Sequence, residues 1–252
     1  MILLFDVGNT NIHMSQSDGK SVTSQYRVKT DPSLTVDELY EKIKAYINNQ
    51  SFEGVAISSV VPTLTRTIAD LCETYLNINP LIVKMGIKTG LLIKTDHPQE
   101  VGADLICAAV DVMKQGHQVI VDLGTAIKYI YVDNNKMKGV IITPGVDISM
   151  KALVGNTALL PEISIEVPKK VLGTNTIECM QSGVTYGVAA QIEGLLQRIE
   201  HEIQTPFHVT LTGGISPVIS PLIKYPHTLD DYVVLKGLLS IYHKNKENNH
   251  EL

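Results

Sequence analysis

The sequence predicts an α/β protein built from two related halves. Short apolar runs that suit buried strands alternate along the chain with stretches of helical hydrophobic spacing. The composition, 44% hydrophobic and 19% charged over 252 residues, is that of a globular chain. Two apolar runs about half the chain apart end in the same Asp-x-Gly turn, at Asp6 and at Asp122. We therefore expect one half over residues 1–113 and a second over 114–252.

The first half opens with a strand and contains three amphipathic helices. Its expected elements are a strand at 2–7, a helix at 33–49, a strand at 54–61, a helix at 62–75, a strand at 80–83 and a helix at 102–114. Ser33 is the expected cap of the first helix, with Asp37 and Glu38 in its first turns. The second helix is expected to begin at Pro62, and the third is entered at Gly102.

The second half repeats the alternation with a longer helix. Its expected elements are strands at 118–122, 127–132 and 137–142, a helix at 176–203, a strand at 209–211 and a helix at 232–242. Asn134 and Asn135, between two strands, predict a hairpin turn. The polar residues from 243 onward are expected to fray.

Charge and composition exclude several classes of partner. The net charge of −5 argues against binding to nucleic acid or to an anionic membrane surface. No apolar run reaches the ~20 residues of a membrane span, and the N-terminus lacks the basic region of a signal peptide. The three cysteines are widely spaced, which disfavours a disulfide framework or a cysteine zinc site. We expect a cytoplasmic protein.

The repeated Asp-x-Gly turn suits phosphate binding. A glycine lets the backbone approach a ligand closely, so that its N–H groups and those that follow can hold phosphate oxygens. The hydroxyl groups of Thr10 and Thr125 add donors, and an aspartate can hold a hydrated Mg²⁺ ion. Two such turns facing each other across a cleft would hold a polyphosphate. The Thr-Gly-Gly sequence at 212–214 is a third close-approach turn, suited to a nucleoside or its phosphates.

Each of these motifs is also common in ordinary turns. The prediction of phosphate binding therefore depends on their occurring together. Other nucleotide and hydrolase signatures are absent: no Walker-type phosphate loop, no G-x-G-x-x-G after a strand, and no G-x-S-x-G elbow. The eight histidines form no metal-binding motif.

Eight short motifs identify a family. They are MILLFDVGNTNI at the N-terminus, SSVVP at 58–62, HPQEVGAD at 97–104, DLGTA at 122–126, ITPG at 142–145, LGTNT at 172–176, QSG at 181–183 and TGG at 212–214. In this order, over nearly the whole chain, they resemble the type III pantothenate kinases. The resemblance implies two ribonuclease-H-like domains of the acetate and sugar kinase, heat-shock chaperone ATPase and actin superfamily. It further implies a homodimer that phosphorylates pantothenate to 4'-phosphopantothenate with ATP, the first step of coenzyme A biosynthesis.

The resemblance also implies roles for individual residues. The first phosphate loop would comprise Asp6, Val7, Gly8, Asn9, Thr10 and Asn11, with Asp6 near Mg²⁺. The second would comprise Gly124 and Thr125, and Asp122 would be the ligand of a monovalent cation, K⁺ or NH₄⁺. The positions that match the pantothenate pocket are Thr95, Gly102, Ala103, Asp104, Leu105 and Thr176.

Asp104 is the expected catalytic residue, as proton acceptor for the primary hydroxyl of pantothenate. Because it lies where a helix begins, it would also stabilise the helix dipole by about 0.3–1 kcal/mol in a purely structural role. The surrounding EVGAD match favours the catalytic role.

The chain departs from the family mainly on the substrate side. Leu105 replaces an arginine, and Thr95 replaces a tyrosine. Lys128 stands where the family continues with threonines and an aspartate, and is either a substitute cation or a solvated strand residue. Three functions therefore stay open: a pantothenate kinase with a variant pocket, a non-catalytic or regulatory relative, and a kinase for another small hydroxy acid.

Overall fold

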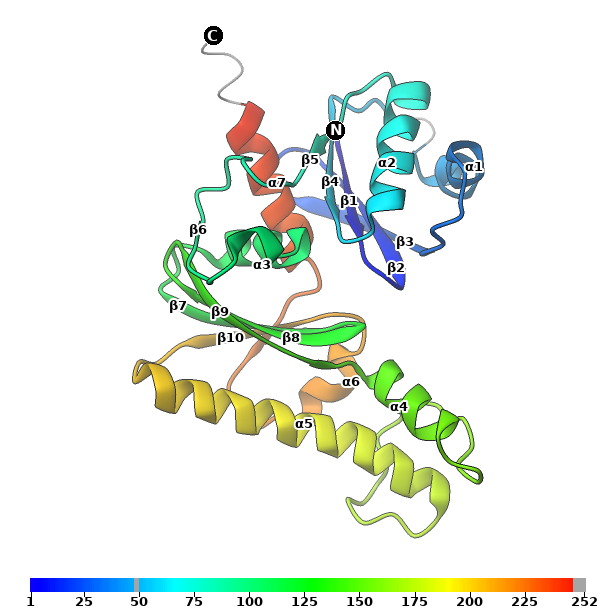
Figure 1. The fold of residues 1–252 in the computed structure, drawn as a ribbon, viewed down its shortest axis with the longest axis vertical. Helices are drawn as coiled ribbons and strands as arrows, with labels where there is room; N and C mark the ends of the chain where they lie inside the picture. The colour runs from blue at the N-terminus through cyan, green and yellow to red at the C-terminus, as the bar shows by residue number, and fades with distance from the viewer. Residues whose placement is uncertain (48–49, 247–252) are drawn as a thin grey trace. The chain divides into compact units, whose positions relative to one another are not determined.

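The computed structural model describes residues 1–47 and 50–246, which form two compact units (Figure 1). The first unit contains residues 1–114, 135–137 and the C-terminal segment from Tyr232. The second contains residues 115–134 and 138–231. The predicted halves, 1–113 and 114–252, differ from this division in the place of the C-terminal helix. No helix in the described ranges is both long enough and apolar enough to cross a membrane.

A five-stranded sheet with the order β3-β2-β1-β4-β5 forms the centre of the first unit. Its strands are β1 (Ile2–Val7), β2 (Asn11–Ser17), β3 (Val22–Lys29), β4 (Gly54–Ser59) and β5 (Leu81–Ile82). The central strand β1 is antiparallel to β2 and parallel to β4. It is nearly all apolar because both of its faces are covered.

Helices pack on the strands of this sheet. They are α1 (Val36–Ile47), α2 (Pro62–Leu71) with a π-helical turn at Cys72–Leu76, α3 (Ala103–Val112) and α7 (Val233–Lys246). One core cluster joins buried side chains of α1 and α2 to those of the sheet, and includes Leu3, Phe5, Leu39, Ile43, Leu64 and Ile68. The short strand β6 (Leu92–Ile93) pairs with Lys136 and Met137, and a 3₁₀ turn at Pro98–Glu100 precedes α3.

The C-terminal helix α7 belongs to the first unit because it packs tightly against α3, β1 and β4. A Cβ atom at Gly237 would overlap the carbonyl oxygen of Cys107 in α3. A Cβ atom at Gly54 would overlap the ring of Tyr242 in α7. Two glycines therefore permit backbone and ring approaches that no other residue allows at those positions.

The second unit contains five strands and one long helix. The strands are β7 (His117–Leu123), β8 (Ala126–Asp133), β9 (Lys136–Pro144), β10 (His208–Thr212) and β11 (Thr228–Leu229). The helices are α4 (Val146–Gly155), α5 (Thr176–Ile203), α6 (Ser216–Ile219) and a 3₁₀ turn at Ser220–Leu222. Ala189, Ile192 and Leu196 of α5 pack on Val121 and Tyr129 of the sheet.

Five neighbouring strands of the second sheet repeat the strand order of the first. The order β9-β8-β7-β10-β11 corresponds to β3-β2-β1-β4-β5, and the second sheet has β6 as a sixth strand beside β9. The first strand of each unit is central, antiparallel to the next strand in the chain and parallel to a later one. This repetition confirms the predicted α/β class and the two related halves.

Most predicted elements are confirmed, and the helix at 176–203 has the predicted bounds. The predicted cap at Ser33 is wrong: α1 begins at Val36, because Thr35 and Glu38 cap each other. The Thr35 N–H donates to Glu38 Oε2 at 2.9 Å, and the Glu38 N–H donates to Thr35 Oγ1 at 3.3 Å. The last two residues of the predicted helix, 48 and 49, lie outside the described ranges.

The predicted fraying from residue 243 is wrong for residues 243–246, which continue α7. Side-chain contacts hold this turn: His243 Nε2 lies 2.8 Å from the carbonyl oxygen of Gly19, and Asn245 Nδ2 donates to the carbonyl oxygen of Lys88 at 2.9 Å. The rest of that tail, 247–252, lies outside the described ranges. Sequence reasoning missed β2, β3 and α4.

Replacing Gly237 with alanine tests the approach of α7 to α3. Because the added Cβ atom would overlap the Cys107 carbonyl oxygen, we expect Gly237→Ala to lower the free energy of unfolding by about 2 kcal/mol or more. Gly194→Ala is the matched control, because within the described residues no atom lies within 4 Å of the new Cβ. That control should raise stability by about 0.5–1 kcal/mol through helix propensity. Equal urea midpoints for both variants would contradict this packing.

A second prediction concerns pH. Burial, with a smaller contribution from Arg27, lowers the pKa of His13 to about 4, below its ordinary value of 6.5. As the pH falls, His13 is therefore protonated in the unfolded chain before it is protonated in the folded chain. The contribution of this group to the free energy of unfolding is complete above pH 6.5 and is lost as the pH drops toward 4. We expect a loss of about 2 kcal/mol at pH 5 from this group. Urea unfolding at pH 7.5 and 5 measures it, and His13→Gln should remove this share of the pH dependence.

Candidate functional site

The first predicted phosphate loop is the turn between β1 and β2. The Gly8 N–H donates to the Asn11 carbonyl oxygen at 3.0 Å, which closes the turn and leaves the side chains of Asn9 and Thr10 exposed. The side chain of Val7 is buried, so only its backbone faces the loop. Asn11 begins β2 and is half-buried.

Thr30 holds this loop from outside it. Its hydroxyl donates to the carbonyl oxygen of Gly8 at 2.7 Å, and its N–H donates to that of Thr10 at 2.9 Å. Sequence reasoning missed Thr30, because β3, which ends beside it, was not predicted. The alternation of exposed and half-buried residues in β3 and the Asp18-Gly19 turn before it could have revealed the hairpin.

Asp6 lies near the end of the central strand, beside two polar residues on neighbouring strands. It is in register with His13 of β2 and with Ser58 of β4. The Ser58 hydroxyl, which is buried, donates to Asp6 Oδ1 at 3.3 Å. Ser58 therefore orients the carboxylate that the resemblance assigns to Mg²⁺.

Asp104 lies in the first turn of α3, against the glycine that caps the helix. A Cβ atom at Gly102 would lie 2.5 Å from Asp104 Oδ1, so this glycine leaves room for the carboxylate. Burial raises the pKa of the Cys107 thiol, and the charges of Asp6 and Asp104 raise it further, while Ser58 forms a hydrogen bond with it. Both carboxylates thus lie near one thiol, and the first unit brings them together. The buried Cys107 is held protonated and is no nucleophile.

The remaining first-unit pocket residues differ in exposure. Ala103 and Leu105 are buried, which leaves Asp104 as the partly exposed side chain of this turn. The hydroxyl oxygen of Thr95 is buried and has no hydrogen-bond partner in the described part of the chain. Such a group costs about 1–3 kcal/mol unless a ligand or water satisfies it. Thr95 is therefore suited to receive a hydrogen bond from a ligand or to donate one.

The second predicted phosphate loop joins β7 to β8, and Gly124 and Thr125 are exposed on it. Two glycines from other motifs pack against it. Gly145 donates its N–H to the Thr125 carbonyl oxygen at 3.1 Å, and a Cβ atom there would overlap that oxygen. Gly213, at φ +96°, is so close that a Cβ atom would lie 2.6 Å from the Leu123 carbonyl oxygen. The ITPG and TGG motifs therefore shape this loop, whatever ligand it holds.

Asp122 and Lys128 form an ion pair at the base of this loop. They are opposite each other in register on β7 and β8, and Lys128 Nζ lies 2.7 Å from Asp122 Oδ2. Their side chains are only 16% and 17% exposed, respectively. Of the two interpretations of Lys128, a solvated strand residue is therefore wrong: its ammonium group is a cation bound to Asp122.

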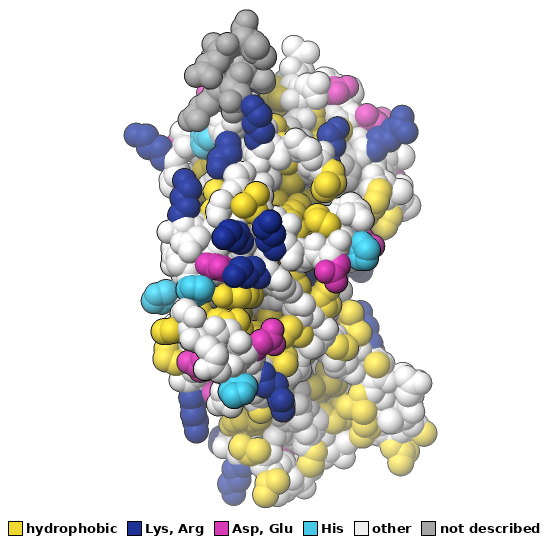
Figure 2. Space-filling model, turned by 60° about the vertical axis from the view of Figure 1, so that its left-hand side comes forward, with side chains coloured by type: hydrophobic (Ala, Val, Ile, Leu, Met, Phe, Trp, Pro, Cys, Tyr) yellow, Lys and Arg dark blue, Asp and Glu magenta, His cyan; other side chains and the backbone are white. Residues whose placement is uncertain are grey.

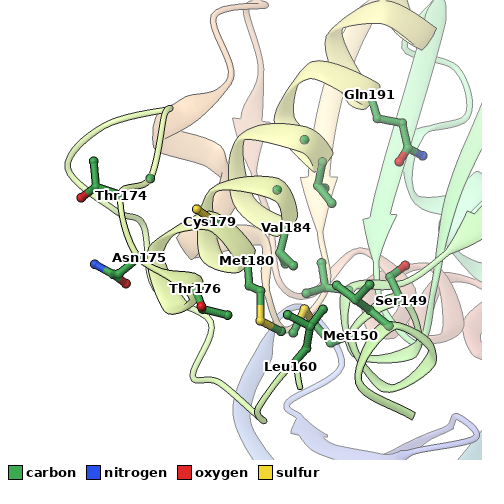
Figure 3. A pocket seen from close by; sticks show the side chains of 16 residues that line it. Ser149, Met150, Leu160, Thr174, Asn175, Thr176, Cys179, Met180, Val184 and Gln191 are labelled. Carbon is green, nitrogen blue, oxygen red and sulfur yellow. The ribbon is translucent and has the colours of Figure 1, made fainter. Parts of the chain in front are cut away.

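Thr176 is the exposed first residue of α5 in the second unit. The preceding residue, Asn175, caps the helix by accepting the Glu178 N–H at 3.0 Å. Thr176 borders a pocket of about 930 Å³ between α4 and α5, into which Met150, Leu160 and Met180 point (Figure 3). The lining is mainly apolar, so this pocket suits hydrophobic contacts more than phosphate.

The described residues contain no group of three or more His, Cys, Asp or Glu side chains that could hold a metal by themselves. Mg²⁺ in nucleotide sites needs fewer protein ligands, because it keeps several waters and binds one or two carboxylates plus phosphate oxygens. Asp6, oriented by Ser58 beside the first loop, fits that requirement.

Comparisons with solved structures agree with this fold. The chain is similar to a conserved putative Baf family transcriptional activator from Campylobacter jejuni, with a TM-score of 0.63 and 19% identity over 97% of this chain and 99% of that one. It is also similar to the activator of 2-hydroxyisocaproyl-CoA dehydratase from Clostridium difficile with bound ADPNP, with a TM-score of 0.57 and 16% identity over 100% and 97%. At these identities the likeness supports the fold alone, an actin-like ATPase and sugar kinase fold.

Sequence comparisons are more specific. Residues 2–198 match the family model described as type III pantothenate kinase. A type III pantothenate kinase from Acholeplasma laidlawii is 47% identical over 97% of this chain and 99% of its own length. One from Exiguobacterium sp. is 40% identical over 98% and 100%. The chain belongs to the type III pantothenate kinase family.

Proposed function

We propose that this chain transfers the γ-phosphoryl group of ATP to the primary hydroxyl of pantothenate, giving 4'-phosphopantothenate in the first step of coenzyme A biosynthesis. The observation that carries this proposal is the grouping of Asp6, Asp104 and Ser58 around the Cys107 thiol in the first unit. The Asp6 carboxylate would bind the metal, and the Asp104 carboxylate would accept the proton of the attacking hydroxyl.

Asp104 accepts the proton of the pantothenate hydroxyl as it attacks phosphorus. Phosphoryl transfer proceeds through a loose transition state, so positioning and charge neutralisation contribute most of the catalysis. Gly102 leaves the space that the Asp104 carboxylate occupies, and the start of α3 sets its direction. Gly102 is in this sense a positioning residue.

Asp6 and each of the two loops supply groups that bind phosphate. Bound Mg²⁺ would neutralise the charge of the phosphate oxygens. Asp6 would hold that ion, while the exposed residues Thr10 and Thr125 donate hydrogen bonds to phosphate oxygens. Thr30 stabilises the first loop and Gly145 stabilises the second, each through a hydrogen bond to a backbone carbonyl oxygen of the loop.

Thr95 contributes to the recognition of pantothenate. Its buried and unpartnered hydroxyl, in the described part of the chain, is matched by the hydroxyl, amide and carboxylate groups of that substrate. Leu105 supplies no charge and is buried, so it does not replace the ion pair that an arginine would make. The altered pocket favours one second candidate, a kinase for another small hydroxy acid.

We propose further that the enzyme acts as a homodimer in the cytoplasm, where ATP is available. Exposed hydrophobic side chains gather near α4 and the start of α5: Leu153, Leu159, Val171, Leu172 and Ile177. Leu159 is 91% exposed and Leu172 is 84% exposed, and hydrophobic side chains are visible at the surface in Figure 2. A patch of this kind marks an interface, and a second copy would cover it beside Thr176.

Asp104→Asn tests the catalytic role. Because the amide cannot accept the hydroxyl proton, we expect kcat for pantothenate-dependent ADP release to fall by about 100-fold or more. The control is Asp111→Asn on the same helix, which should keep the activity of the unmodified chain. Full activity in Asp104→Asn would contradict the role. ATP turnover with another hydroxy acid in place of pantothenate would favour the second candidate, and none with any acid would favour a non-catalytic relative.

The proposed dimer is tested by charge substitution. Introducing Leu159→Glu and Leu172→Glu together should convert a dimer into a monomer in sedimentation velocity, because two buried carboxylates would lie unpaired at the interface. Leu229→Glu is the matched control, since Leu229 is 50% exposed on β11 and outside the patch. An unmodified chain that sediments as a monomer at micromolar concentration would refute the dimer.

A further inference from the structure

Each half of the fold places a basic residue opposite its aspartate. In the first unit, Asp6 of β1 is in register with His13 of β2. In the second unit, Asp122 of β7 is in register with Lys128 of β8. Because five neighbouring strands follow the same order in both sheets, His13 and Lys128 occupy equivalent positions.

The two basic residues differ in chemical type. His13 carries an imidazole ring, and the carboxylate of Asp6 accepts a hydrogen bond from Ser58 on the other neighbouring strand. Lys128 places its amino group 2.7 Å from Asp122 Oδ2, and the two side chains form an ion pair. Asp122 therefore already has a cation bound within the chain.

A monovalent cation does not fit Asp122 in this arrangement. K⁺ or NH₄⁺ would need the oxygen to which Lys128 is bound, or would lie next to the lysine charge and be repelled by it. With its side chain only 16% exposed, the carboxylate offers little solvent-filled space for a second cation. An alkylammonium group also has the same charge and similar hydrogen-bond donors as NH₄⁺, one of the two ions expected there.

We propose that Lys128 is the permanent cation of Asp122, and that this kinase therefore works without added K⁺ or NH₄⁺. The inference rests on the proposed function and departs from the monovalent cofactor that the resemblance implies. The ion pair joins β7 to β8 on both sides of the Gly124–Thr125 turn, so it positions the second phosphate loop. Lys128 is a positioning residue, because it acts on the nucleotide through Asp122 and this loop.

The first experiment measures pantothenate-dependent ADP release with Mg²⁺ in choline chloride, KCl or NH₄Cl at one ionic strength. For the unmodified chain, we expect rates that agree within about twofold in all three salts. A rise of tenfold or more with K⁺ or NH₄⁺ would overturn the proposal. If this chain turns over no pantothenate in any salt, the proposed function fails, and the stability measurement below still tests the inference.

Lys128→Ala opens the space beside Asp122 to an ion from solution. We expect its activity in choline chloride to fall at least tenfold, mainly through KM for ATP, and to be partly restored by NH₄⁺ or K⁺. The matched control is Lys138→Ala, which removes a lysine equally close, at 2.7 Å, to Asp133. That control should show no dependence on the cation. Full activity of Lys128→Ala in choline chloride would overturn the proposal.

Thermal unfolding supplies a readout that needs no turnover. The Tm of the unmodified chain should be the same in KCl and in choline chloride at equal ionic strength. The Tm of Lys128→Ala should rise with KCl over the millimolar range, because the ion binds the folded state only. A K⁺-dependent Tm in the unmodified chain, or none in Lys128→Ala, would contradict a cation site that the lysine fills.

Discussion

Backbone approaches that only glycine permits shape the proposed functional site of this chain. Gly145 and Gly213 bring two separate segments against the second proposed phosphate loop, and Gly102 leaves space for the Asp104 carboxylate. In each case, an added Cβ atom would lie closer to a backbone or carboxylate oxygen than the van der Waals contact distance allows. The loop at Gly124 and Thr125 is therefore shaped by the backbone packing of two other segments against it, and both of its residues are exposed.

The two units share one order of five strands, but the surroundings of their central aspartates differ. The aspartate at the end of each central strand is in register with a basic residue, and in the second unit that residue, Lys128, forms an ion pair with it. In the first unit, Ser58 donates a hydrogen bond to the aspartate. The residue opposite each aspartate on the neighbouring strand therefore differs between the two units, and with it the charge that the carboxylate meets within the chain.

Much of the fold could be predicted from local patterns. The apolar strand at 2–7 and the helix at 176–203 were predictable because burial on both faces and a long helical spacing leave clear signatures. The hairpin β2–β3 leaves a weaker signature, because every second residue of β3 is exposed and the buried positions of β2 include Ser15, Gln16 and Ser17. Patterns could not reveal the contacts of Thr30 or the Lys128 ion pair, since both depend on the strand register and on contacts between segments. The motif resemblance supplied Asp6, Asp104 and Asp122, whereas their surroundings came only from the structure.

The return of α7 to the first unit has a consequence for biosynthesis. The strands β1 and β4 and the helix α3 are made early, but the helix that packs on them begins at Val233. During synthesis on the ribosome, the packing of the first unit is therefore incomplete until α7 has been translated. Until then, the apolar surface that α7 covers stays exposed. Vectorial synthesis therefore favours completion of the second unit first, although its residues are translated later.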